Sequence, residues 1–168
     1  VRDSNWRDSG AGVLPDLGCH LLDTLRFWFG HNYDAKFEVR SAFAHENKSF
    51  DQVVIGSNDT PTIQLEMTML SWRNHFTCDV LAEKGSAHIE SLCKWGPSTF
   101  IHRNRILPSG RPTEETDTLE AEDPTWLQEY NHFTKLCLNK GGSNLENDIW
   151  INYTLRELAK SVGVNTND

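Results

Sequence analysis

The sequence predicts an α+β fold: an open, mostly antiparallel β-sheet of about five to seven strands, with helices packed on one face. Apolar residues recur at helical spacing near both ends of the chain and at alternate positions in the middle. Short gaps that contain glycine separate the alternating runs, which favours hairpins and therefore antiparallel pairing. The 168 residues, 38% of them apolar, predict one domain over 1–168.

The first element is predicted as a helix between Gly10 and Gly30. Pro15 suits the first turn of a helix, and Gly30 suits the position just past its end. One side of this helix is apolar and is predicted to face the core, through Leu14, Leu17, Leu21, Leu25 and Trp28. On the other side, Asp16, His20 and Asp23 follow one another at i, i+4 and i+7.

This polar side has more than one interpretation. It is either a solvated helix face or an acid/base site, because carboxylates beside an imidazole favour its protonated form. A metal site at Asp16, His20 and Asp23 is a further alternative, but no second cluster supplies another ligand, so no metal is predicted. Gly18, inside the helix, indicates either close packing or the approach of another group to the backbone.

Alternating runs predict the strands, in the ranges 37–43, 50–56, 63–69, 76–82, 87–91 and 99–107. The polar, acidic stretch 107–122 is predicted as a loop. A second helix is expected from Asp123-Pro124 to about Leu138, and a third from about Asn144 to Val162. Their core-facing residues are predicted to be Leu127, Tyr130, Phe133 and Cys137, then Ile151, Leu155, Leu158 and Val162. The uncovered face of the sheet is expected to carry Gln64, Glu66, Thr68, Thr77, Asp79, His88 and Glu90.

Composition restricts the partners. The net charge is −8 and Lys and Arg do not cluster, which argues against nucleic acid. No apolar run approaches the roughly 20 residues that span a bilayer, so no membrane is expected. The four cysteines are widely spaced without a CxxC, which favours free thiols and a cytoplasmic location.

The run Gly10-Ala-Gly-Val-Leu-Pro-Asp16-Leu-Gly18-Cys-His20-Leu-Leu-Asp23, followed by an aromatic-rich turn and Gly30, resembles a family signature. It is the one that opens the second domain of the glucose–fructose oxidoreductase/inositol dehydrogenase/MocA (Gfo/Idh/MocA) family, with Ala11 in place of the middle glycine. The resemblance implies a C-terminal domain of dihydrodipicolinate-reductase-like fold, in an NAD(P)-dependent oxidoreductase that acts on a sugar, a sugar derivative or a polyol. His20 would exchange a proton with the substrate hydroxyl, and Asp16 would orient it.

The same resemblance implies further roles. Trp6, Arg7 and Asp23 would contact the sugar-like substrate, with Arg7 suited to a carboxylate or phosphate, and Gly18 would lie near the nicotinamide. NAD or NADP would be bound mainly by an N-terminal Rossmann domain, because the chain has no G-x-G-x-x-G motif. The chain is therefore expected to be an inactive fragment on its own, and a homo-oligomer formed through the sheet face.

Two alternatives remain open. One is a non-catalytic assembly or binding module that uses the sheet face. The other is a metal-dependent hydrolase or isomerase that uses Asp16, His20 and Asp23.

Overall fold

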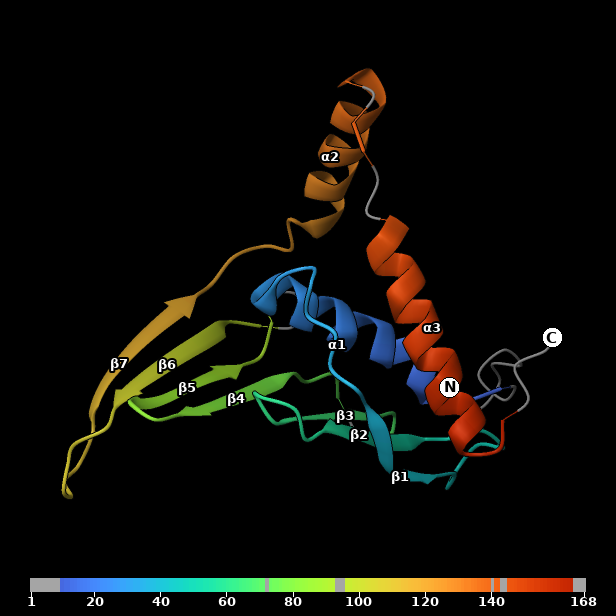
Figure 1. Ribbon diagram of the computed structural model, residues 1–168. Helices are drawn as coiled ribbons and strands as arrows, with labels where there is room; N and C mark the ends of the chain where they lie inside the picture. The colour runs from blue at the N-terminus through green and yellow to red at the C-terminus, as the bar shows by residue number, and fades with distance from the viewer. Residues whose placement is uncertain (1–9, 72, 93–95, 140, 143–144, 165–168) are drawn as a thin grey trace. The chain divides into compact units, whose positions relative to one another are not determined.

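The computed structural model describes residues 10–71, 73–92, 96–139, 141–142 and 145–164. The described residues contain ten elements, labelled in Figure 1. In chain order they are α1 (Val13–Phe29), β1 (Glu38–Phe43), β2 (Gln52–Ser57), β3 (Ile63–Thr68), β4 (Thr77–Ala82), β5 (Gly85–Glu90), β6 (Ser98–Asn104), β7 (Thr113–Leu119), α2 (Thr125–Asn139) and α3 (Leu145–Ser161). This confirms the α+β class.

All pairing in the described chain is antiparallel, but it forms two sheets rather than the single predicted one. The first sheet has the order β1-β2-β3 and the second the order β4-β5-β6-β7. The chain divides accordingly into two compact units. Unit 1 comprises Val1–Leu70 and Ser143–Asp168, and unit 2 comprises Ser71–Gly142.

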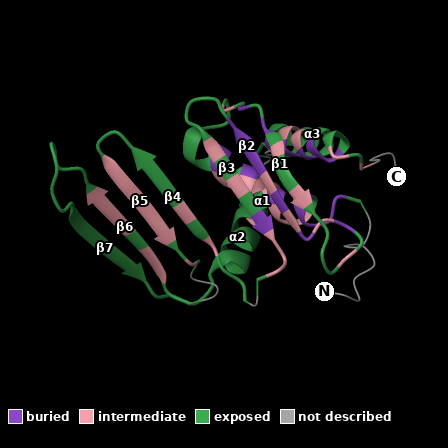
Figure 2. Ribbon diagram, turned by 90° about the horizontal axis from the view of Figure 1, so that it is seen from below, coloured by how far each residue is buried: buried purple, intermediate pink, exposed green. Residues whose placement is uncertain are grey.

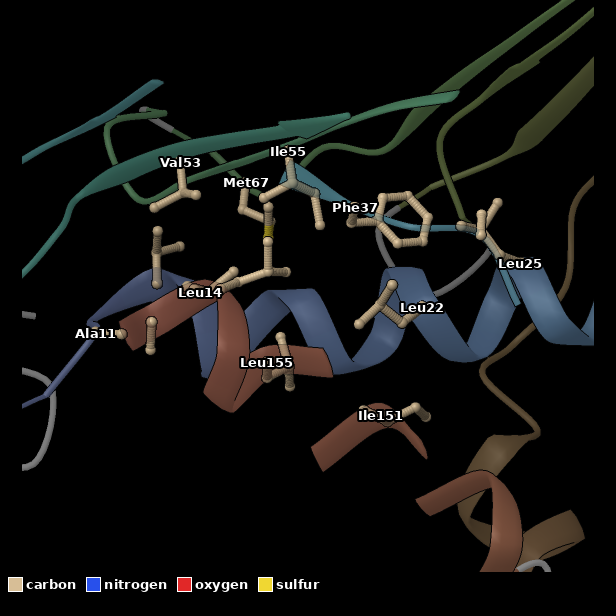
Figure 3. Packing of buried hydrophobic residues seen from close by; sticks show 14 residues of the cluster. Ala11, Leu14, Leu22, Leu25, Phe37, Val53, Ile55, Met67, Ile151 and Leu155 are labelled. Atoms are coloured by element: carbon tan, nitrogen blue, oxygen red, sulfur yellow. The ribbon is translucent and has the colours of Figure 1, made fainter. Parts of the chain in front are cut away.

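The core lies in unit 1, where α1 packs between the first sheet and α3. Figure 3 shows Leu14 and Leu22 of α1 in one cluster with Ile55 and Met67 of the strands and Leu155 of α3. Both helices therefore lie on the same side of this sheet, as predicted.

The glycine-rich turn positions α1 against the loop before β2. Gly12 has φ 58°, and a Cβ there would overlap the backbone of Phe50. The next residue, Val13, donates its backbone N–H to the Phe50 carbonyl at 2.9 Å. The turn thus needs glycine both for its conformation and for its close approach to Phe50.

The buried side of α1 differs from the predicted one. Leu14 and Leu25 are buried as expected, together with Gly18 and Leu22, whereas Trp28 is 42% exposed. Leu17 and Leu21 are half-buried. The buried side is rotated because α3 covers α1 as well as the sheet does.

Unit 2 has a sheet but no core among its described residues. Figure 2 shows β4 to β7 with intermediate and exposed residues only. The predicted loop 107–122 contains β7, which is exposed along its whole length and lacks the apolar alternation that would have revealed it. Its backbone pairs with β6 from Ser98↔Leu119 to Asn104↔Thr113.

The bounds of α2 agree with the prediction, but its burial does not. Asp123 Oδ1 accepts the backbone N–H of Thr125 at 3.0 Å, which caps the helix start. No residue of α2 is buried, so the prediction of a core-facing side was wrong. In α3, Ile151, Leu155 and Leu158 are buried as predicted, and Val162 is half-buried just past the helix end.

Candidate functional site

The polar side of α1 faces away from the core. His20 and Asp23 are exposed, and Asp16 is half-buried. The reason is helical periodicity: these positions lie opposite Leu14, Gly18 and Leu22, which are buried. Asp16, His20 and Asp23 therefore share one accessible helix face, as the spacing predicts.

Asp23 is held by α3. The side-chain amide of Asn147 donates to Asp23 Oδ1 at 2.6 Å, and Asn147 is only 2% exposed. The other end of the same amide, Oδ1, accepts from Arg26 Nη1 at 3.5 Å. Asp23 thus has a structural hydrogen-bond partner, and this hydrogen bond restricts movement of the Asp23 side chain toward a substrate.

Arg26 anchors this network in the interior. Its Nε donates to the Tyr33 carbonyl at 3.1 Å, and its guanidinium lies 3.8 Å from the centre of the Trp150 ring. The Trp150 indole N–H donates in turn to Asp34 Oδ1 at 2.8 Å. Burial lowers the pKa of Arg26, and the nearby charge of Asp34 opposes this shift. The guanidinium remains a cation because the ordinary pKa of arginine is far above neutrality.

Sequence reasoning did not find the Asp23–Asn147–Arg26 cluster. Its partners lie 124 residues apart at Asp23 and Asn147. One signal was present: Arg26 follows Asp23 by three residues, at the edge of the apolar side of the helix. That position predicts a partly buried cation but not its partner.

Gly18 is explained by packing. A Cβ at this position would lie 3.0 Å from Leu155 Cδ2 and 3.1 Å from Met67 Sδ. The backbone at Gly18 is buried under these two side chains. This favours the close-packing explanation over the approach of a nicotinamide.

Two predicted substrate contacts, Trp6 and Arg7, lie outside the described residues.

Beside the polar side of α1, the Cys19 thiol donates to the Asp16 carbonyl at 3.4 Å. Burial raises the pKa of Cys19, and the charge of Asp16 adds to this effect against an opposing backbone hydrogen bond. Cys19 therefore stays a thiol at neutral pH and is a poor nucleophile.

Unit 2 holds a second histidine–carboxylate group. His88 Nδ1 lies 2.7 Å from Asp79 Oδ1, and His88 Nε2 lies 3.5 Å from Glu90 Oε2. The sequence placed His88 on the uncovered face of the sheet without a partner, although the turn at Glu83-Lys84 contained the signal. A two-residue turn pairs Ala82 with Gly85 and therefore Asp79 with His88. Thr77, Asp79, His88 and Glu90 do share one face of this sheet, as predicted.

Two hollows of the described chain lie in unit 2. One is lined by Arg73, Asn74, His75, Glu90 and Ser91. The other lies beside the β4–β5 and β6–β7 turns and is lined by residues that include Arg103 and Arg105. Neither includes a residue of α1.

Two further features are absent from the residues that the structure describes. No group of three or more His, Cys, Asp or Glu side chains is placed to hold a metal ion. Of the helices that the structure describes, none has the length and apolar character needed to cross a bilayer.

Comparison with known proteins places these features in a family. The chain matches the family described as GFO/IDH/MocA C-terminal domain over residues 2–88, more than half of its 168 residues. The matched segment contains the glycine-rich turn, α1 and its polar side, and β1 to β4. Neither the curated proteins nor the solved structures gave a match. The chain belongs to the Gfo/Idh/MocA oxidoreductase family, of which it carries the C-terminal domain.

Proposed function

We propose that the chain is the substrate-binding and oligomerisation domain of an NAD(P)-dependent oxidoreductase acting on the CH–OH group of a sugar, a sugar derivative or a polyol. The observation that carries this proposal is the accessible face of α1. It presents an exposed imidazole, His20, one turn from Asp16, on a helix whose opposite side is fixed in the core. A rigid element that holds an exposed proton donor and acceptor is suited to general acid–base catalysis.

The proposed role of His20 is proton exchange with the substrate. In the oxidation direction its imidazole accepts the hydroxyl proton of the substrate, and in the reduction direction it returns that proton to the oxygen. Asp16, one turn earlier on α1, would orient the imidazole. Asp23 would contribute a substrate hydrogen bond only through the oxygen that Asn147 leaves available.

The surroundings of Gly18 do not favour a nicotinamide site at this position. Gly18 is covered by Leu155 and Met67, so its backbone offers no room for a ring. NAD or NADP would supply the hydride chemistry from a nucleotide-binding domain, and this chain would supply the proton. Trp6 and Arg7 stay proposed substrate contacts. We also propose a cytoplasmic location and an oligomer formed through the polar sheet face around His88.

The test is a substitution in the enzyme that combines this domain with its nucleotide-binding domain. We expect His20→Ala to lower kcat by about 10²–10⁴-fold, the range typical for loss of a general acid–base group. The matched control is His31→Ala, an exposed histidine just past the end of α1, which should leave kcat unchanged. A kcat of His20→Ala within about threefold of the parent would remove His20 from the chemistry.

The two alternatives from the sequence differ in their support. A metal-dependent hydrolase or isomerase gains none, because Asp16, His20 and Asp23 are not placed as a metal site. A non-catalytic assembly module would use the face of the second sheet that carries Asp79, His88 and Glu90. It would be favoured by substrate turnover that does not depend on His20.

A further inference from the structure

One hollow of unit 2 is cationic, although the chain as a whole is acidic. It lies at the end of the sheet where the β4–β5 turn meets the β6–β7 loop, since Gly85 pairs with Asn104, and Asn104 with Thr113, at that end (Figure 1). Its polar lining consists of Ser86, Arg103, Asn104, Arg105 and Ser109. No carboxylate of the described residues lines it, although the chain has 24 Asp and Glu against 16 Lys and Arg. The hollow therefore favours an anion.

The two arginines of this hollow lie on the same side of one strand. Arg103 belongs to β6, and the backbone N–H of Arg105 continues the pairing by donating to the Lys84 carbonyl at 2.8 Å. Residues two apart on an extended strand point to the same side. Two neighbouring cations repel each other, and an anion bound between them removes this repulsion.

Both guanidinium groups are held in place and still have donors to spare. Arg103 Nε donates to Glu114 Oε2 at 2.7 Å, and Arg105 Nη1 donates to the Glu83 carbonyl at 3.3 Å. Within the described part of the chain, Arg105 forms no ion pair with a carboxylate. Each guanidinium has five N–H groups, so most of them remain available to a ligand. A side chain that is already held loses less conformational freedom when it binds.

We propose that this hollow binds the phosphate group of a sugar phosphate. The planar forks of Arg103 and Arg105 match the oxygens of a phosphate, and the hydroxyls of Ser86 and Ser109 add further donors. The hollow has a volume of about 380 Å³, within the range of small-molecule sites and larger than a phosphate ion alone fills. The ligand therefore carries an organic part in addition to its phosphate.

The rest of the lining indicates what this organic part is. Hydroxyl and amide side chains, from the two serines and Asn104, suit the hydroxyl groups of a sugar. No aromatic side chain of the described residues lines the hollow, so a nucleobase finds no stacking partner there. These features favour a sugar phosphate over a nucleotide.

The first experiment measures binding directly. The 168-residue chain is titrated with glucose 6-phosphate in a buffer without phosphate, and the amide signals of Ser109 and Gly110 are followed by NMR. We expect them to shift and saturate with a dissociation constant of about 1 mM or below. Inorganic phosphate should bind more weakly, because it lacks the sugar, and glucose should not bind.

Three results of this titration would overturn the proposal. The first is the absence of saturable shifts up to about 20 mM glucose 6-phosphate. The second is equal affinity for inorganic phosphate, which would show that the hollow makes no use of the sugar. The third is equal affinity for glucose, which would show that the phosphate is not recognised.

The second experiment compares two arginines of the same loop. Arg105→Gln should raise the dissociation constant for glucose 6-phosphate at least about 10-fold, because it removes charge-assisted hydrogen bonds. Arg111→Gln is the matched control: Arg111 is exposed and does not line the hollow. It removes the same charge and should change the dissociation constant by less than about twofold. Equal effects of the two substitutions would show attraction to the loop in general and would contradict a site.

A third variant tests Arg103 with the opposite sign. Glu114 accepts from Arg103 Nε and so competes with a phosphate for the same cation. Glu114→Gln should therefore tighten binding of glucose 6-phosphate by about two- to fivefold. Unchanged or weaker binding would show that Arg103 does not contact the phosphate. All these measurements read the binding of a probe in unit 2, so they are independent of the proposed role of His20.

Discussion

Asp51 is a buried carboxylate with a structural function. It is 1% exposed at the end of the β1–β2 loop, and it accepts the backbone N–H groups of His45, Glu46 and Asn47 as well as the Asn47 side-chain amide. Burial by itself raises the pKa of Asp51, but these hydrogen bonds outweigh it and lower the pKa to about 2. The carboxylate charge therefore organises the loop that leads into β2.

The lowered pKa predicts the pH dependence of stability. A carboxyl group with a lower pKa in the folded protein stabilises the fold above its ordinary pKa of 3.8, and this contribution is lost as the pH falls toward about 2. Asp51→Asn should lower the free energy of unfolding by about 2 kcal/mol at pH 7, and it should flatten the loss of stability below pH 5. Urea denaturation at a series of pH values measures both effects.

Glu66→Gln is the control for this prediction. Glu66 is an exposed carboxylate that accepts a hydrogen bond from Gln52 at 2.8 Å. Its substitution should change stability by no more than about 0.5 kcal/mol. Equal acid sensitivity of the wild type and Asp51→Asn would show that Asp51 does not carry the predicted contribution.

At the scale of elements, the contact between α1 and α3 depends on a polar clamp as well as on apolar packing. Asn147 connects Asp23 to Arg26 through the two ends of one amide. Asn147→Ala leaves both partners without this amide, and it should lower the free energy of unfolding by about 1–3 kcal/mol. Asn152→Ala, at an exposed position of the same helix, should have little effect.

A double-mutant cycle isolates the hydrogen bond between Asp23 and Asn147. The variants are Asp23→Ala, Asn147→Ala and their combination, measured by urea denaturation. We expect the two substitutions to be less than additive by at least about 0.5 kcal/mol, because each removes the same interaction. Strict additivity would show that the clamp contributes through burial alone.

The elements show what periodicity can and cannot predict. It predicted the bounds of α2 and the position of its apolar side, because both follow from local sequence. It did not predict that this side is exposed, since amphipathicity identifies a face but not the surface that covers it. It missed β7, because a strand exposed on both faces and held by its backbone has no apolar alternation.

For the candidate site, too, local sequence predicted some features and could not predict others. Helical spacing placed Asp16, His20 and Asp23 on one accessible face, and it left two explanations for Gly18. Only the fold distinguishes these explanations, because Leu155 is distant in sequence from the glycine it covers. The partner of Asp23 at Asn147 was beyond local sequence for the same reason.

At the scale of the whole molecule, burial is distributed unequally between the two units. Every buried apolar residue of the described chain belongs to unit 1, although unit 2 has the larger sheet, with four strands. Alternation predicted strands in both units and a single sheet. It gave no sign of this inequality, because alternation predicts a strand but not how far the strand is buried, and no residue of β4 or β5 is buried.

This inequality predicts different opening energies for two matched strands. β2 and β5 each have six residues, and each is hydrogen-bonded to a neighbour on both sides. Val53 and Ile55 of β2 are 1% and 0% exposed, whereas no residue of β5 is buried. Opening β2 must expose the core, but opening β5 breaks little beyond the sheet itself. We therefore expect amide hydrogens of β5 to exchange at least about 100-fold faster than those of β2, measured by hydrogen–deuterium exchange. Equal protection of the two strands would contradict this prediction, because it would show that another surface covers the sheet of unit 2.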